Sequence, residues 1–308
     1  MQQLLDIVAL LLAKALVGLM YFLPRPVAMG IAHLCVSCFR VVNPRITRVA
    51  RRNLELVFAE RTPQEREQIL KESFRVHAAN LVGFAEIPRL TQDNIFELCD
   101  FSGVVEMAAE LRRNVPGKGT LFLVPHLGCF ELFSQMWCIA NRPVATLVRP
   151  FDLPRLNAWW NARRELHGME IFSRSGGYKE VLHRLSSGQD VSLMFDQNVK
   201  ANHAIFVDLF GIPAATTKTV AFVALRTGCT IAFGTMVEVS PWKFKVIYQP
   251  IDNPIDEQGS YEDKALRLTR RVHECLESVV RQYPAQWFWI HRRFKTRPPG
   301  EPENIYAV

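Results

Sequence analysis

Two long apolar runs open the chain, residues 7–23 and 27–42, and Lys14 is the one charged residue within the first of them. The first run has about the minimum length that can cross a bilayer. A secretory signal peptide is disfavoured, because Asp6 precedes the run and Pro24-Arg25-Pro26 follows it where small residues should mark a cleavage site. We therefore expect residues 1–43 to form a helical membrane anchor, a hairpin lying in or partly through one leaflet. The alternative is a pair of helices buried in a soluble protein.

Downstream of the anchor the pattern is helical to about residue 100 and then changes. Thr62 before Pro63 and Glu65 signals a helix start. After Gly119, short apolar runs alternate with helical stretches, and an apolar hairpin and an amphipathic helix follow. The predicted strands are residues 120–124, 144–148, 169–172, 191–195, 230–239 and 243–248, and the predicted helices are residues 129–140, 153–167, 178–185, 218–226 and 261–282. This alternation predicts an α/β fold with a mixed, largely parallel sheet flanked by helices, formed by residues 44–308 as a single domain.

Polar residues stand where several of the predicted strands end. His126 follows residues 120–124, Arg149 follows residues 144–148, and Asp196-Gln197 follows residues 191–195. The carboxyl ends of parallel strands meet at one edge of a sheet, where open α/β folds bind their ligands. We therefore expect a base, a cation and an acid to gather at this edge, although polar strand ends that only support the fold are also common.

His126 has a second polar residue near it in sequence, Glu131, which we expect in the first turn of the following helix. Gly128 permits a tight turn between them. A histidine that takes a proton from a hydroxyl needs one free ring nitrogen, with the other held by an acceptor. Glu131 is a plausible acceptor, which predicts a general base. The structural alternative is a satisfied strand-end histidine beside an acid that complements a helix dipole.

Composition limits the partners without choosing one. The 308 residues carry a net charge of +7, which suits an anionic membrane, a phosphorylated substrate, an acidic carrier protein or nucleic acid. Nucleic acid is disfavoured, because no helix-turn-helix, RNP or zinc-finger pattern accompanies the basic residues. Seven scattered cysteines are typical of reduced thiols in the cytosol, and Cys35-x-x-Cys38 lacks the second pair that a zinc site needs.

Orientation and the chain's end add to the membrane interpretation. Arginines follow the first apolar run, so the rest of the protein should face the cytoplasm. Near the C-terminus, Trp287 and Trp289 stand beside a basic cluster, residues 291–297. Tryptophan next to arginine fits a lipid headgroup boundary or a phosphate site.

These motifs together resemble the late acyltransferases of lipid A biosynthesis, a bacterial family. The resemblance rests on the H-x-x-x-x-E motif of residues 126–131, on Arg149-Pro150, Arg164 with Gly168, Asp196-Gln197, residues 210–217, and the block of residues 291–298. It extends from the N-terminal apolar segment nearly to the C-terminus. Cys129, Val148 and Phe195 depart from the family pattern, but none of them replaces a proposed catalytic group.

The resemblance implies a glycerolipid-acyltransferase-like fold and an acyl carrier protein-dependent O-acyltransferase of the inner membrane. His126, oriented by Glu131, would be the general base that activates a hydroxyl of a Kdo-bearing lipid A precursor. Arg149 and Arg164 are carried over as candidates for substrate phosphate or oxyanion binding, with Arg163 as the neighbour that sequence cannot separate from Arg164. Asp196 and Gln197 are candidates for substrate binding or for support of the site. No metal and no cofactor is implied, since acyl-acyl carrier protein is the co-substrate.

Three other classes compete with this assignment. A glycerolipid or lysophospholipid acyltransferase would use the same His-Glu pair, but residues 210–213 stand where its anion-binding block is expected. A metal hydrolase would need ligands beyond His126 and Glu131 at suitable spacing. A non-catalytic membrane adaptor would tolerate loss of His126.

Overall fold

The computed structural model describes residues 2–173, 176–301 and 305–306. Its helices are α1 (Gln2–Phe22), α2 (Arg25–Val42), α3 (Pro44–Val57), α4 (Pro63–Glu86), α5 (Gln92–Leu98), α6 (Val104–Arg113), α7 (Phe130–Ala140), α8 (Pro154–Arg164), α9 (Gly177–Ser186), α10 (Lys218–Thr227) and α11 (Tyr261–Gln282), with short 3₁₀ turns η1 (Ile87–Arg89), η2 (Ala201–His203), η3 (Pro254–Asp256) and η4 (Pro284–Gln286). Its strands are β1 (Cys99–Asp100), β2 (Thr120–Val124), β3 (Ala145–Val148), β4 (Glu170–Ser173), β5 (Val191–Met194), β6 (Ala204–Leu209), β7 (Ile212–Thr217), β8 (Thr230–Ser240) and β9 (Lys243–Ile251).

The main sheet is mixed and largely parallel, which confirms the predicted fold class. In the described part of the chain its strand order is β1-β9-β8-β2-β5-β3-β4, and the β8–β9 hairpin is its antiparallel pair. Strand β2 lies near the centre, between β8 and β5. The carboxyl ends of β2, β5 and β3 therefore meet at one edge, as the sequence predicts.

Both faces of β2 are buried, in agreement with its continuous apolar run. Leu121 and Leu123 belong to a core shared with α9, α10 and α11. Phe122 and Val124 belong to a second core shared with α5, α6 and α7 on the other face. The fold is thus a sheet between two helical layers, and its central strand β2 is buried on both faces.

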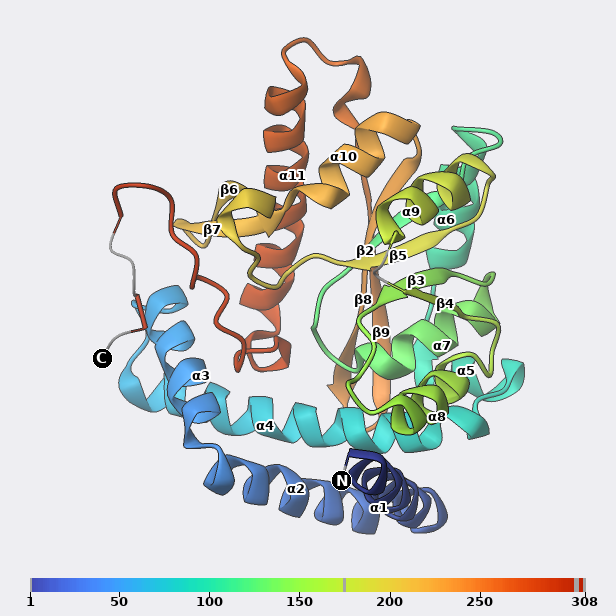
Figure 1. The fold of residues 1–308 in the computed structure, drawn as a ribbon, viewed down its shortest axis with the longest axis vertical. Helices are drawn as coiled ribbons and strands as arrows, with labels where there is room; N and C mark the ends of the chain where they lie inside the picture. The colour runs from blue at the N-terminus through green and yellow to red at the C-terminus, as the bar shows by residue number, and fades with distance from the viewer. Residues whose placement is uncertain (1, 174–175, 302–304, 307–308) are drawn as a thin grey trace.

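Helix α4 connects the sheet to the N-terminal helices. It begins at a capping box, in which Thr62 accepts from the Glu65 backbone and Glu65 accepts from the Thr62 backbone. Figure 1 shows α2 running alongside α4 on the side away from the sheet, with α1 beside it. The predicted helical pair of the anchor is therefore present, and it packs against the α/β domain.

The outer faces of α1 and α2 are apolar and open. Both helices are long and apolar enough to cross a membrane, although little of either is buried by the rest of the protein. Leu12 of α1 is 66% exposed and Val42 of α2 is 83% exposed. On the inner face, the Asp6 carboxylate accepts hydrogen bonds from the backbone N–H groups of Arg155 and Leu156 at the start of α8. One buried acid therefore fixes α1 to the start of α8.

One part of the fold differs from the sequence prediction. Residues 206–217 are not among the strands predicted from the sequence, but they form most of a separate antiparallel hairpin of β6 and β7. Phe210, with φ of 57°, and Gly211, with φ of 75°, make the turn. The hairpin packs on α11.

Candidate active site

The loop after β2 holds His126 in a fixed position. Gly128 has φ of 64°, and a side chain there would place its Cβ 1.9 Å from the carbonyl oxygen of Met236. The Gly128 N–H donates to Gln286, and the Phe288 N–H donates to the His126 carbonyl. Backbone bonds on both sides thus tie this loop to the segment after α11, and only glycine fits at the bend.

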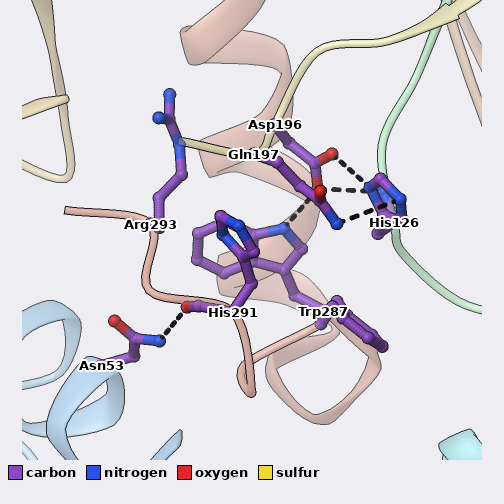
Figure 2. Close-up of a pocket in the computed structure, with 8 residues that line it drawn as sticks. Asn53, His126, Asp196, Gln197, Trp287, His291 and Arg293 are labelled. Carbon is purple, nitrogen blue, oxygen red and sulfur yellow. Dashed lines mark hydrogen bonds and ion pairs between the residues drawn. The ribbon is translucent and has the colours of Figure 1, made fainter. Parts of the chain in front are cut away.

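Asp196 is the partner of the His126 ring. Strand register pairs Val124 of β2 with Met194 of β5, so the residues two positions further along each strand lie opposite each other. His126 Nδ1 lies 2.7 Å from Asp196 Oδ1, and the His126 backbone N–H donates to Oδ2 over 2.9 Å (Figure 2). The predicted gathering of histidine and acid at this edge is therefore present between two neighbouring strands.

This geometry corrects the predicted role of Glu131 as the acceptor for His126. Glu131 lies in the first turn of α7, as expected, but its carboxylate binds Arg164 of α8: Nε donates to Oε2 over 2.9 Å, and Nη2 donates to Oε1. Glu131 is the second residue of α7, and its side chain faces α8. The nearest acid in sequence and the nearest acid to the ring are different residues.

The Asp196 carboxylate is buried and ionised. Burial alone would raise its pKa, but the electrostatic interaction with His126, together with hydrogen bonds from His126 and from the Trp287 indole, holds the pKa below its ordinary value. Trp287 Nε1 donates to Oδ2 over 2.9 Å. Because Asp196 accepts from Nδ1, the proton of neutral His126 lies on Nδ1 and the lone pair lies on Nε2.

Gln197 faces that lone pair. Its Nε2 lies 3.2 Å from His126 Nε2, so the amide donates to the nitrogen that a substrate hydroxyl would approach (Figure 2). The hollow beside these groups has a volume of about 10 Å³, room for about one water molecule. The lining residues are Asn53, His126, Asp196, Gln197, Trp287, Phe288, His291 and Arg293.

A larger cleft lies next to the His126 ring, and the side chains of Phe130 and Phe288 stand between them. The ring centroids of Phe130 and Phe288 lie 5.4 and 5.7 Å from that of His126. Both phenyl groups line a cleft of about 190 Å³ whose other lining residues are His77, Asn80, Leu81, Phe84, Glu131 and Trp160. This cleft is mostly apolar, with the Glu131 carboxylate at its wall.

The arginines from the sequence analysis separate into three environments. Arg164 holds Glu131 beside the cleft, and its guanidinium also lies over the Trp160 ring. Arg163 points elsewhere and donates to the carbonyls of Phe84 and Ala85. Arg149 follows β3 at the same sheet edge but is exposed. The structure therefore distinguishes Arg164 as the arginine at the cleft.

Several residues of the C-terminal segment support the site instead of facing a membrane or phosphate. Trp287 is 3% exposed and Trp289 is fully buried, so the headgroup-boundary prediction is wrong for both. Arg293 is also buried and donates to the Ala215 carbonyl and to Thr216. The sequence signal that could have indicated this is the high aromatic content of the block, which is typical of a core.

Cys129 lies between His126 and Glu131 in sequence but is not placed as a nucleophile. Burial raises the pKa of its thiol to about 12. A thiol with that pKa holds almost no thiolate near neutral pH. Within the described residues, no group of three or more His, Cys, Asp or Glu side chains is placed to hold a metal ion.

The sequence matches one protein family over nearly its whole length. Residues 3–296 match the family described as bacterial lipid A biosynthesis acyltransferase. The lipid A biosynthesis myristoyltransferase of Escherichia coli K12 is 27% identical over 249 residues, 81% of this chain and 75% of the relative. The lipid A biosynthesis palmitoleoyltransferase of the same strain is 24% identical over 91% of this chain and 88% of the relative. The lipid A biosynthesis lauroyltransferase of that strain is 26% identical over 84% of this chain and 82% of the relative.

Proposed function

Because this chain belongs to the bacterial lipid A biosynthesis acyltransferase family, we propose that it transfers a fatty acyl chain from acyl carrier protein to a hydroxyl of a Kdo-bearing lipid A precursor. The single observation that carries the mechanism is the pairing of His126 Nδ1 with the buried Asp196 carboxylate. That pairing leaves Nε2 as the proton acceptor at the edge of an apolar cleft.

His126 acts as the general base. The acceptor hydroxyl gives its proton to Nε2 as its oxygen attacks the thioester carbonyl carbon. The C–O bond forms, the tetrahedral intermediate collapses, and the C–S bond breaks. The imidazolium then returns the proton to the leaving thiolate. Asp196 stabilises the imidazolium in between, in the role that the sequence analysis assigned to Glu131.

Before substrate binds, the Gln197 side chain is hydrogen-bonded to the proton-accepting nitrogen of His126. Its amide donates to His126 Nε2, so the acceptor hydroxyl must displace that bond in order to react. The displaced amide can then donate to an oxygen of the bound acceptor. This exchange keeps the lone pair of the base satisfied until a hydroxyl arrives.

Arg164 supplies positive charge at the cleft. Its guanidinium is held by Glu131 and remains partly exposed, with a side-chain exposure of 21%. A cation fixed in this way stabilises an oxyanion or an anionic substrate group without reorganising. In this proposal Glu131 positions Arg164, and the apolar cleft beside them receives the acyl chain.

Membrane contact follows from the acceptor. An acylated lipid stays in the bilayer, so the enzyme must hold the edge of its sheet at the headgroup level. The open apolar faces of α1 and α2 suit that contact, and arginines that follow α1 suit an orientation toward the cytoplasm at the inner membrane. Acyl carrier protein, an acidic partner, would approach the basic domain from that side.

The test is acyl transfer by the purified full-length protein in detergent. Acyl carrier protein thioesters of different chain length are offered with a Kdo-bearing tetra-acylated lipid A precursor, and the products are read by mass spectrometry. The proposal expects one added acyl chain on the precursor. Transfer to glycerol phosphate or a lysophospholipid, with none to the precursor, would instead establish the glycerolipid alternative.

A further inference from the structure

A second hollow, separate from the His126 site, is lined by arginines of α3 and of the C-terminal segment. It has a volume of about 440 Å³. We call it the arginine cleft and define it by its lining residues, Arg45, Arg48, Val49, Arg51, Arg52, Glu55, Arg292 and Tyr306. Figure 1 shows α3 leaving the end of α2, with the C-terminal segment beside it.

The positive charge in the arginine cleft is only partly balanced. Arg51 pairs with Glu67 over 3.1 Å, and Arg52 pairs with Glu55 over 3.2 Å. Across the described residues, these pairs leave Arg45 and Arg48 exposed without a carboxylate partner. The first turn of α3 also contains no acidic residue. The cleft therefore has unneutralised guanidinium groups on a rigid helix.

Arg292 adds another guanidinium to the arginine cleft. Its Nε is buried and has no hydrogen-bond partner among the described residues, while its guanidinium lies 5.7 Å from the centroid of the Tyr306 ring. A buried N–H without a partner is unfavourable, and more so when the group is charged. An anion held by the neighbouring arginines would lower the electrostatic cost of this cation.

The arginine cleft continues toward the apolar helices. An adjoining hollow of about 410 Å³ shares Arg48 and Arg51 with it and is lined on the α2 side by Arg40 and Val41. Val41 and the next residue, Val42, are 81% and 83% exposed. The two hollows thus adjoin through Arg48 and Arg51, and they lead from the basic wall of α3 to the exposed valines at the end of α2.

We propose that the arginine cleft binds the phosphate of an anionic phospholipid whose acyl chains lie against the exposed end of α2. Guanidinium groups bind phosphate through paired, charge-assisted hydrogen bonds, and no carboxylate of the described residues pairs with Arg45 or Arg48. This inference rests on the proposed contact of α1 and α2 with the membrane. It adds a lipid-binding site that acyl transfer itself does not require.

Shape and position favour a lipid over acyl carrier protein as the occupant. A carrier protein presents a broad folded surface, whereas the arginine cleft is concave and has an apolar rim at Val41. A phospholipid has both parts, a phosphate and a chain, at the matching ends. The cleft is also close to the catalytic machinery, because Asn53 of α3 donates to the carbonyls of Trp289 and His291, the residue before Arg292. A bound lipid would therefore hold the segment that carries Trp287.

The test measures binding of dioctanoyl phosphatidic acid, with dioctanoyl phosphatidylcholine as the neutral-headgroup comparison, to the full-length protein in non-ionic detergent. The test variant is Arg45→Ser with Arg48→Ser. The matched control is Arg226→Ser with Arg270→Ser, which removes the same charge from exposed positions on α10 and α11. We expect Kd for phosphatidic acid to rise about 10-fold or more in the test variant, for the loss of charge-assisted bonds, and to stay within about 2-fold in the control. Arg45→Lys with Arg48→Lys should restore part of the affinity.

Other outcomes would overturn the inference. Equal weakening in both double variants would mean that overall charge, and not this cleft, attracts the lipid. Unchanged phosphatidic acid binding with lost binding of acyl carrier protein would assign the cleft to the carrier. The outcome is distinguishable from failure of the proposed function, because acyl transfer is measured separately on the same proteins. If the protein transfers acyl chains but shows no preference for phosphatidic acid over phosphatidylcholine, the proposed function stands and the proposed lipid site is wrong.

Discussion

Trp287 donates its indole N–H to Asp196 over 2.9 Å, which links the C-terminal segment to the carboxylate that faces His126. The bond is buried. Among the described residues, Asp196 accepts from three N–H groups, which belong to the Trp287 indole, the His126 ring and the His126 backbone. The orientation of the base thus depends on a residue far from it in sequence.

Trp287→Phe removes this donor and keeps an aromatic ring in the core. We expect a loss of about 1–3 kcal/mol in the free energy of unfolding, since a buried acceptor loses a bond, together with slower acyl transfer. Chemical denaturation and the transfer assay measure the two effects. Trp289→Phe is the matched control, because its indole donates to the Pro284 carbonyl and not to Asp196. The control should lose stability but retain most of the activity, and equal loss of kcat in both variants would contradict the assigned role.

The roles of the two acids can be separated by their effects on the chemical step. Asp196→Asn should lower kcat about 10²- to 10⁴-fold, because the amide carries no negative charge to stabilise the imidazolium. Glu131→Gln should weaken the hold on Arg164 and lower kcat less than Asp196→Asn does. Steady-state kinetics of the two variants measure the difference, and a larger loss of kcat in Glu131→Gln than in Asp196→Asn would restore the role that the sequence analysis gave to Glu131.

Gly128→Ala tests the close approach of the His126 loop to β8. The new Cβ would meet the Met236 carbonyl oxygen, and the residue has a positive φ. We expect the free energy of unfolding to fall by about 1–3 kcal/mol more than in Gly103→Ala. Gly103 is the control because its φ of 71° is similar and nothing lies within 4 Å of the added Cβ. Equal losses would mean that backbone conformation alone explains the effect.

Stability should fall on mild acidification because of His77. Burial lowers the pKa of this side chain from 6.5 to about 4. The unfolded chain therefore binds a proton that the folded chain excludes, so the free energy of unfolding decreases as pH falls from about 6.5 toward about 4. His77→Leu should reduce the loss between about pH 7.5 and about pH 5 by on the order of 1–2 kcal/mol. Thermal unfolding at the two pH values measures it, and His183→Leu, at an exposed position, should leave the pH dependence as it is.

Much of the fold can be predicted from the sequence, because the central strands are apolar on both faces. The prediction for residues 261–282 matches α11, and the runs at residues 120–124 and 191–195 locate β2 and β5. The pairing of β2 with β5 cannot be predicted in the same way, since β3 and β4 lie between them along the chain. That pairing determines which acid faces His126. Glu131 is the closer acid in sequence, but the strand order brings Asp196 to the His126 ring.

The other errors have similar physical causes. Residues 206–217 contain a proline, a glycine and small residues, which weaken a strand signal, yet the hairpin pairs along its length. Trp287 and Arg293 combine a polar group with a large apolar surface, so their composition fits both a lipid boundary and a core. In the structure, Trp287 and Arg293 are buried and donate hydrogen bonds to Asp196 and Ala215. These partners are distant in sequence, so the sequence alone could not identify them.

The most direct test of the account is the single-turnover rate of acyl transfer from acyl carrier protein to the lipid A precursor by the wild-type protein and by His126→Asn. The account predicts a rate about 10²- to 10⁴-fold lower in the variant, with unchanged binding of both substrates, because the proton acceptor is lost. A His126→Asn protein that acylates the precursor at the wild-type rate would contradict the claim that this imidazole is the base.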